Sequence, residues 1–282
     1  MYLVKIACEM PDSQGRSLSQ WDSQELAKEL VRAGIVGSIS ASTVRRILRS
    51  HQLKPWRVHA WLSPKVPRDS AFAKSIREIT RLYTRKLKAN EIVLCMDEKT
   101  SLQPRPRPVA TRPAQAKLPV RVEHEYKRDG ALNLFAAFDT RSGKVWGQTY
   151  ERKRQVEMIQ FLEYLDGQIP QTITQIHIVL DNLPMHKGVK VQAWLQTHPR
   201  FIFHYPPVHC SWMNQVEQWF SILQRKRLKI ANFKDKQALA ERLQAFIAEW
   251  NAQAHPFQWS SKSGAKVMAK CKTAKKTRAK AV

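Results

Sequence analysis

The chain has 282 residues, 43% of them hydrophobic, so it can hold one large or two modest domains with real cores, and wholesale disorder is excluded. It carries 48 Lys and Arg against 23 Asp and Glu, and this net charge of +25 indicates a polyanionic partner, most simply nucleic acid. Four scattered cysteines without a CxxC pair indicate neither a disulfide framework nor a zinc site, and no apolar run reaches membrane-spanning length, so a cytoplasmic protein without a membrane partner is expected.

Residues 1–60 are predicted to contain a small all-α module with two short helices. Asp22 can cap the first helix, which ends near Gly34 and has its apolar positions on one face: Leu26, Ala27, Leu30 and Val31. Ser40 can cap the second helix, whose inward positions are Val44, Ile47 and Leu48. Two short helices joined by a glycine-containing turn predict a helix-turn-helix domain.

The outward face of the second helix is rich in hydroxyl and basic side chains, which can contact base edges and phosphates in a major groove. The expected DNA contacts on it are Ser42, Thr43, Arg45, Arg46 and Arg49. The alternative is an ordinary solvated helical face. A basic, proline-containing segment follows, in which Lys54 and Arg57 are further candidates for DNA contact.

Residues 61–90 are interpreted as a basic linker and a helix beginning near residue 69. From residue 91 the pattern changes to alternating strands and helices. The apolar runs 92–96 and 176–180 predict buried strands, and residues 132–138 and 144–150 flank a turn typical of a hairpin. The remaining predicted elements are helices near 155–165, 187–197, 212–229 and 235–251 and a strand at 201–203.

This order predicts an α/β domain over residues 91–255, with a mixed sheet flanked by helices in the ribonuclease-H-like architecture. Residues 256–282 contain basic but no acidic side chains, which is typical of a disordered, phosphate-binding tail, or of a tail that only increases solubility.

Three acidic residues are candidates for catalysis. Asp97 closes the first apolar run, Asp181 closes the second, and Glu217 lies at the edge of the apolar stripe of a predicted helix. A carboxylate at the end of a buried strand can point into a cleft, so two strand ends and a helix can bring three carboxylates together. Because Mg²⁺ prefers such oxygen ligands, the pattern predicts a polynucleotidyl transferase or nuclease. Glu98 follows Asp97, so either of these two could be the ligand.

Clustered carboxylates repel one another unless a cation neutralises them. Two Mg²⁺ ions about 3.5–4 Å apart would stabilise the attacking and leaving oxygens of an in-line displacement. Mn²⁺ can substitute for Mg²⁺. Asp97 is expected to bridge both ions, while Asp181 and Glu217 each hold one. The nucleophile is first water and then a DNA 3′-hydroxyl, so no covalent enzyme intermediate is expected.

Basic and polar side chains near these acids are expected to contact the DNA backbone. They lie in the proline-rich loop after the first strand, in the segments around Asp181 and in the helix of Glu217, and they are Arg105, Arg107, His186, Lys187, His209, Asn214 and Arg225. Zinc binding by His186 and His209 is disfavoured, because their spacing is wide and no cysteine assists them. Phosphate contact or a hydrogen bond to a metal-binding carboxylate is preferred.

Five short segments carry a resemblance to a known family: 96–101, 124–128, 132–139, 180–187 and 211–223. In this order they resemble DDE transposases, and more narrowly the bacterial insertion-sequence branch of the mariner superfamily. Two upstream segments, 40–48 and 53–57, resemble the DNA-binding helix and linker of that branch. The resemblance covers most of residues 15–255.

The resemblance implies a catalytic triad of Asp97, Asp181 and Glu217, Mg²⁺ dependence and cut-and-paste transposition. It also implies binding to terminal inverted repeats in double-stranded DNA, a homodimer in the synaptic complex, insertion at TA and a bacterial, nucleoid-associated location. Relatives usually carry two helix-turn-helix units and this chain starts near the second, as expected of a truncated or alternatively initiated copy.

Two other functions remain open. The first is a DNA-binding regulator or decayed transposase that occupies element ends without cutting. The second is a structure-selective nuclease of the same fold.

Overall fold

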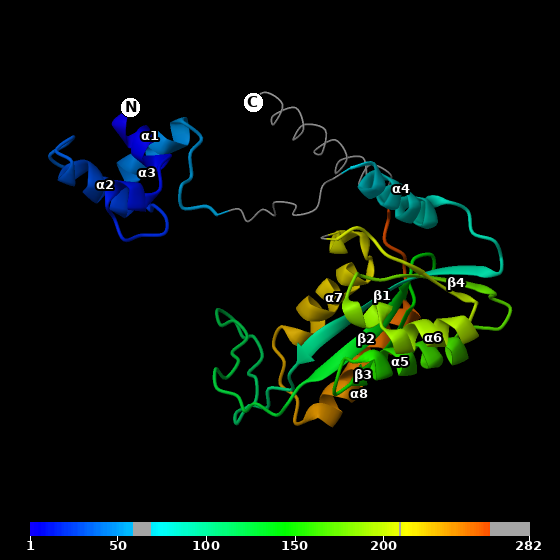
Figure 1. Cartoon of the computed structure of the whole chain (residues 1–282). Coiled ribbons are helices and arrows are strands. Elements are labelled where there is room, and N and C mark those ends of the chain that lie inside the picture. Colours follow the sequence, from blue (N-terminus) through cyan, green and yellow to red (C-terminus); the bar gives the residue numbers. More distant parts are fainter. Residues whose placement is uncertain (59–68, 209, 260–282) are drawn as a thin grey trace. The chain divides into compact units, whose positions relative to one another are not determined.

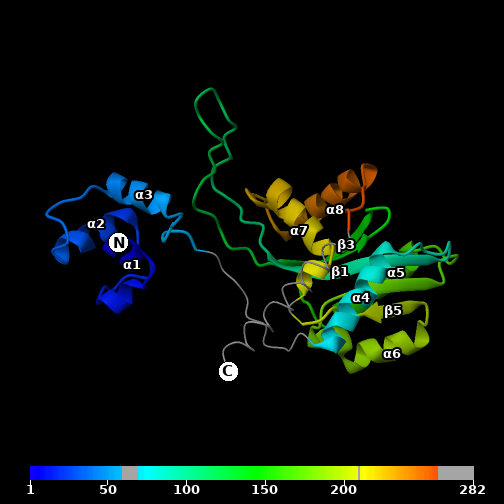
Figure 2. The ribbon, with the colours of Figure 1, turned by 90° about the horizontal axis from the view of Figure 1, so that it is seen from above.

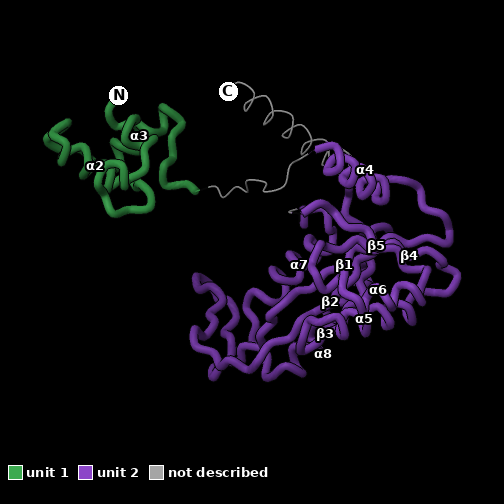
Figure 3. Tube along the Cα trace, in the orientation of Figure 1, with its two compact units in different colours: residues 1–63 green, residues 64–282 purple. Residues whose placement is uncertain are grey.

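The structure is a computed structural model that describes residues 1–58, 69–208 and 210–259 (Figure 1). The chain divides into two compact units, Met1–Ser63 and Pro64–Val282 (Figure 3). The expectations for the linker at 61–68, for His209 and for the tail from residue 260 onward lie outside the described residues. No helix in the described ranges is both long and apolar enough to cross a membrane.

The first unit is helical. Its helices are α1 (Tyr2–Ala7), α2 (Ser23–Arg32) and α3 (Ala41–Ser50), with a 3₁₀ turn η1 at Pro11–Gln14. Both predicted caps form, because Asp22 accepts hydrogen bonds from the backbone of residues 24 and 25, and Ser40 accepts one from the Thr43 N–H. The core is completed by Trp21, which is 1% exposed and donates its indole N–H to the Glu9 carbonyl at 2.9 Å.

Two sequence predictions for this unit need correction. Val31 is predicted on the buried face of α2, but it is 43% exposed, and the residues of α2 that enter the core are Leu26, Ala27 and Leu30. Helix α1 was not predicted, since a helix of six residues contains too few apolar repeats for its period to be recognised.

The second unit contains a five-stranded sheet in the order β3-β2-β1-β4-β5. The strands are β1 (Glu91–Leu102), β2 (Leu132–Asp139), β3 (Val145–Tyr150), β4 (Gln175–Val179) and β5 (Phe201–His204). β1, β2 and β3 are antiparallel, whereas β4 runs parallel to both β1 and β5. The predicted ribonuclease-H-like mixed sheet is therefore confirmed.

Helices cover both faces of this sheet, with α7 and α8 on one side and α6 on the other (Figure 2). The helices are α4 (Ser70–Thr84), α5 (Gln155–Gln168), α6 (Val189–Thr197), α7 (Val216–Leu223) and α8 (Lys236–Ala252). Val93 and Cys95 of β1 pack with α4, α7 and α8, while Leu94 and Met96 pack with α5 and α6. This alternation assigns the positions of β1 to one face or the other as far as Lys99, after which the register shifts.

Short turns connect these elements at η2 (Pro184–Lys187), η3 (Ser211–Met213) and the π-helical η4 (Gln224–Leu228). A long loop leaves the body between β1 and β2 (Figure 2). Its base is held by the Phe233 N–H, which donates to the Pro104 carbonyl at 2.9 Å, and by Arg107, whose guanidinium donates to the carbonyls of Glu123 and Ala231.

Candidate active site

Asp97 lies in β1, and Asp181 lies two residues beyond the end of the neighbouring parallel strand β4. Cys95 of β1 pairs with Val179 of β4, and each aspartate follows two residues later. Because side chains alternate along β1, Asp97 belongs to the face of Val93 and Cys95, which packs against α7, and Asp181 is close enough to its carboxylate to raise the pKa of Asp97. The parallel register therefore brings together two residues 84 positions apart in the sequence.

The end of β1 differs from the prediction. Asp97 closes the apolar run but not the strand, which continues to Leu102. The reason is that β1 remains paired with β2 through Lys99 and beyond, whereas its pairing with β4 ends at Cys95. Asp97 consequently lies where its neighbour β4 has ended, and a side chain there is not covered by a further parallel strand.

Glu217 lies in the first turn of α7, on the same side of the sheet. Val216, Trp219, Phe220 and Leu223 bury one side of this helix, and Glu217 is exposed on the other. It is close enough to repel the Asp97 carboxylate electrostatically and so to raise the pKa of that group. Within the described ranges, no three His, Cys, Asp or Glu side chains already surround one point as metal ligands do.

Asp97 is only 8% exposed and held from two directions. Its Oδ1 accepts the Glu98 N–H at 2.8 Å, and its Oδ2 accepts the Asn214 side-chain amide at 3.4 Å. The same Asn214 amide donates to the Met96 carbonyl at 2.8 Å, which fixes it beside β1. Burial, followed by repulsion from Glu98, Glu217 and Asp181, raises the pKa of Asp97 to about 8.

Asp181 contacts a fully buried histidine. The Nδ1 of His186 lies 3.0 Å from Asp181 Oδ1 and 3.1 Å from the Asp181 carbonyl, and its Nε2 lies 2.9 Å from Glu98 Oε1. Burial alone would lower the pKa of His186, but its hydrogen bonds to Asp181 and Glu98 raise it to about 10. Burial alone would raise the pKa of Asp181, but the hydrogen bonds from His186 and the Leu183 N–H lower it. The ring of His186 therefore lies between the carboxyl groups of Asp181 and Glu98 and is hydrogen-bonded to both.

Glu98 points away from the face of Asp97. Its side chain is 1% exposed and bound to His186, on the side of the sheet where Leu94 and Met96 pack. Of the two adjacent acids, Asp97 is therefore the one that lies on the face of α7.

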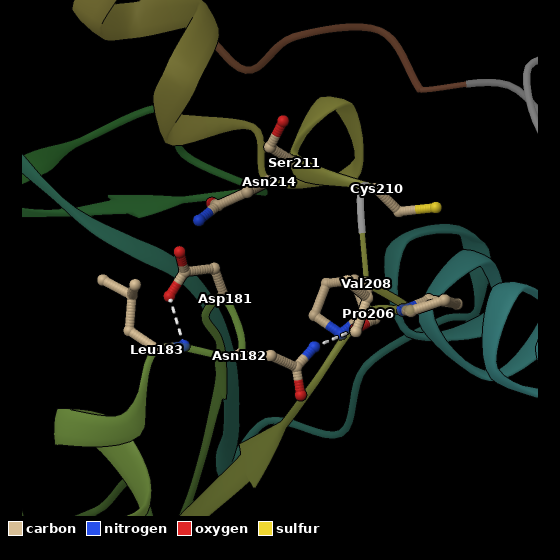
Figure 4. A pocket seen from close by; sticks show the side chains of 9 residues that line it. Asp181, Asn182, Leu183, Pro206, Val208, Cys210, Ser211 and Asn214 are labelled. Atoms are coloured by element: carbon tan, nitrogen blue, oxygen red, sulfur yellow. Dashed lines mark hydrogen bonds between the residues drawn. The ribbon is translucent and has the colours of Figure 1, made fainter. Parts of the chain in front are cut away.

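A pocket of about 320 Å³ opens beside Asp181 and is lined also by Asn182, Leu183, Ser211 and Asn214. Figure 4 shows the Asp181 carboxylate and the Asn214 amide pointing toward the same space, and the hydrogen bond from the Leu183 N–H to Asp181. The pocket reaches the residues that follow β5, including Pro206 and Val208. It gives solvent and ligands access to Asp181.

The predicted DNA contacts fall into three groups. The exposed ones are Ser42, Arg45, Arg46, Arg49, Lys54, Arg57, Arg105, Lys187 and Arg225, with Thr43 partly exposed. His186 and Asn214 are 0% and 1% exposed and contact acidic side chains, so their assignment to a DNA-facing surface needs correction. For His186, the alternative of a hydrogen bond to a carboxylate agrees with the structure. Arg107 is partly buried and donates to loop carbonyls, so much of its hydrogen-bonding capacity is used inside the protein.

The contacts of Glu98 and Asn214 were not recognised in the sequence. Glu98 and His186 are 88 residues apart, and Asp97 and Asn214 are 117 residues apart. No local pattern signals contacts over such separations, although both pairs fall within the motif segments that carry the family resemblance.

Comparison with known proteins gives matches in sequence and in fold. Residues 92–240 match the family described as DDE superfamily endonuclease. The chain is 31% identical over 90 residues to the insertion element IS630 uncharacterized 39 kDa protein of Shigella sonnei, covering 32% of this chain and 26% of that protein. The matched part thus spans about a quarter of that relative.

Two solved structures have a similar fold. One is the Mos1 transposase paired-end complex with left transposon end, with a TM-score of 0.51 and 15% identity over 88% of this chain and 70% of that chain. The other is the Mos1 strand transfer complex, with a TM-score of 0.52 and 15% identity over 88% and 69%. At such identities the likeness shows the fold alone.

Proposed function

Because this chain belongs to the DDE superfamily endonucleases, we propose that it is a transposase that cleaves and joins DNA at Asp97, Asp181 and Glu217. The resemblance to the bacterial insertion-sequence branch of the mariner superfamily is confirmed by the family match and by the relative in sequence. The observation that carries the proposal is that Asp97 and Asp181 each follow the paired residues Cys95 and Val179 by two positions, and that Asp181 and Glu217 both lie close enough to Asp97 to raise its pKa.

The chemistry of these side chains suits a divalent cation. All three offer carboxylate oxygens, and burial and repulsion raise the pKa of Asp97, as expected of a buried carboxyl without a counter-charge of its own. In the part of the chain that the structure describes, no Lys or Arg forms an ion pair with Asp97 or Glu217. Mg²⁺ or Mn²⁺ would be held by the carboxylates of Asp97, Asp181 and Glu217, with two ions expected.

The cations, when bound, polarise the attacking and leaving oxygens of an in-line displacement at phosphorus. The chain's own residues hold the carboxylates in place. Asn214 and the Glu98 N–H fix the two oxygens of Asp97, while the Leu183 N–H and His186 fix Oδ1 of Asp181. Glu217, on the exposed side of α7, lies where DNA can approach. The nucleophiles are water and then a DNA 3′-hydroxyl, so no protein atom bonds covalently to DNA.

DNA recognition is assigned to the first unit and to basic residues near the acids. The outer face of α3 carries exposed Arg45, Arg46 and Arg49, and an exposed basic helix surface suits a major groove. Arg225, exposed just after α7, suits a phosphate beside the acids. Binding to terminal inverted repeats, synapsis as a homodimer, insertion at TA and action in the bacterial cytoplasm are proposed from the family resemblance.

The test is cleavage of duplex DNA carrying the element's own flanking inverted repeats, with and without Mg²⁺. Wild type should cut at the repeat end only with the metal. Asp97→Asn, Asp181→Asn and Glu217→Gln should not cut but should bind the duplex with unchanged affinity in fluorescence anisotropy. Glu163→Gln, at an exposed position of α5 on the other face of the sheet, is the matched control and should cut normally.

The alternatives give different results in the same assay. Binding without cutting by every protein, wild type included, would identify a regulator or decayed transposase. Cutting of branched DNA without preference for the repeat end would identify a structure-selective nuclease. Cutting that survives all three substitutions would refute the proposed site.

A further inference from the structure

His186 joins the carboxyl group of Asp181, which follows β4, to the carboxyl group of Glu98 in β1. It lies in η2, just after the end of β4, and both of its ring nitrogens are engaged, Nδ1 by Asp181 and Nε2 by Glu98. The ring is 0% exposed, and the Tyr205 hydroxyl donates to the His186 carbonyl at 3.1 Å. The orientation of the imidazole is therefore fixed at both ends and at its own backbone.

The contact with Asp181 is directional. Oδ1 of Asp181 receives both the His186 Nδ1–H and the Leu183 N–H, at 3.0 and 3.1 Å. Among the described residues no hydrogen bond engages Oδ2, and the side chain is 36% exposed. One oxygen is thus held by the protein, while the other faces the pocket beside Asp181.

We propose that Glu98 and His186 are positioning residues, which together fix the Asp181 carboxylate so that its Oδ2 is presented to a divalent cation. This inference rests on the proposed function. Glu98 acts by orienting the ring of His186, and His186 acts by donating to Oδ1. Neither touches the cation or the DNA.

A purely structural role explains the arrangement less well. A fully buried Glu–His pair contributes little to stability compared with apolar residues of similar volume, because both groups must be desolvated. Here His186 of the buried pair also contacts the Asp181 carboxylate, which is partly exposed and lines a pocket. Hydrogen-bonded partners of this kind orient metal ligands, and their loss typically lowers metal affinity by about 10–100-fold.

The test is Mn²⁺ binding to the full-length, DNA-free protein, followed by electron paramagnetic resonance of the free ion. His186→Ala should weaken binding by about 10–100-fold. His186→Asn, which keeps a donor near the position of Nδ1, should retain most of the affinity. His186→Gln, which moves the donor toward Glu98, should lose affinity as His186→Ala does. Equal affinities of wild type and His186→Ala would overturn the inference.

A double-substitution cycle separates positioning from folding. If His186 acts through Asp181, His186→Ala should have no further effect on Mn²⁺ affinity in an Asp181→Asn background. An equal loss in both backgrounds would indicate a structural role and overturn the inference. If His186→Ala fails to fold, the Mn²⁺ affinities of His186→Asn and His186→Gln are compared instead. Equal affinities of these two variants would overturn the inference.

Glu98 is tested in the same way. Glu98→Gln should lower Mn²⁺ affinity less than Asp97→Asn, and its effect should vanish in the Asp181→Asn background. A loss that equals that of Asp97→Asn and adds to that of Asp181→Asn would make Glu98 a ligand itself. A wild type that binds no Mn²⁺ and cuts no DNA would refute the proposed function, and the inference with it. A wild type that binds and cuts normally, with His186→Ala unchanged, would refute the inference alone.

Discussion

Replacing Asp97 by asparagine is expected to abolish cleavage and also to stabilise the metal-free protein at alkaline pH. Asp97 is 8% exposed, and burial, then repulsion by Glu98, Glu217 and Asp181, raises its pKa to about 8. In the unfolded chain the same carboxyl ionises near a pKa of about 3.9. Between these two values the folded state holds a proton that the unfolded state has released. The free energy of unfolding is therefore largest below the lower value and falls as the pH rises toward the higher one.

The size of the effect follows from this window. Each pH unit within it costs about 1.4 kcal/mol, so raising the pH from 5 to 8 removes at most about 4 kcal/mol from the free energy of unfolding. Structural relaxation and solvent around Asp97 reduce this loss, and we expect the free energy of unfolding to fall by about 2 kcal/mol between pH 5 and pH 8. The substitution also places an amide nitrogen opposite the Asn214 amide, which costs about 1 kcal/mol at every pH. The pH dependence of the difference in unfolding free energy between Asp97→Asn and wild type therefore reports the titration of Asp97, whereas the difference at a single pH also contains the cost of the mismatched amide.

The measurement is urea unfolding in EDTA at pH 5 and pH 8, followed by hydrogen exchange of peptides from β1 and β2. The free energy of unfolding of Asp97→Asn, relative to that of wild type, should rise by about 2 kcal/mol from pH 5 to pH 8. Asp129→Asn, at an exposed position of the second unit, should gain nothing. Mg²⁺ should stabilise wild type at pH 8 but not Asp97→Asn. If the difference in unfolding free energy between Asp97→Asn and wild type is the same at pH 5 and pH 8, the argument that Asp97 is a buried carboxyl without a counter-charge is refuted.

Three further substitutions test the packing within each of the two units. Arg107→Ala removes donors to two loop carbonyls and should make the loop at 108–122 more sensitive to thermolysin, whereas Arg105→Ala, an exposed neighbour, should not. Trp21→Ala empties the core of the first unit and should lower its free energy of unfolding by about 3–5 kcal/mol in thermal melts, with loss of DNA binding. Gly143→Ala places a Cβ against backbone at a φ of +76° and should lower the free energy of unfolding by about 2 kcal/mol or more in urea, whereas Gly167→Ala, in open space within α5, should not lower it.

Local patterns predicted most of the elements. The caps Asp22 and Ser40, the hairpin of β2 and β3 and the helices of the second unit follow from hydrogen-bonding side chains, turn residues and apolar periods within a few residues of one another. The errors have the same origin. Helix α1 is too short for its period to be recognised, and the end of β1 depends on its pairing with β2, which no pattern inside β1 encodes.

The sequence by itself determined the alternation of strands and helices, the basic surface and the three acidic candidates, because period, charge and motif order are local properties. Only the tertiary structure decided which of Asp97 and Glu98 lies on the face of α7, and that His186 and Asn214 contact carboxylates inside the protein. These contacts join residues 88 and 117 positions apart. They exist because β4 pairs in parallel with β1 in one register and α7 packs on one face, and a shift of one residue would turn each side chain to the opposite face of the sheet.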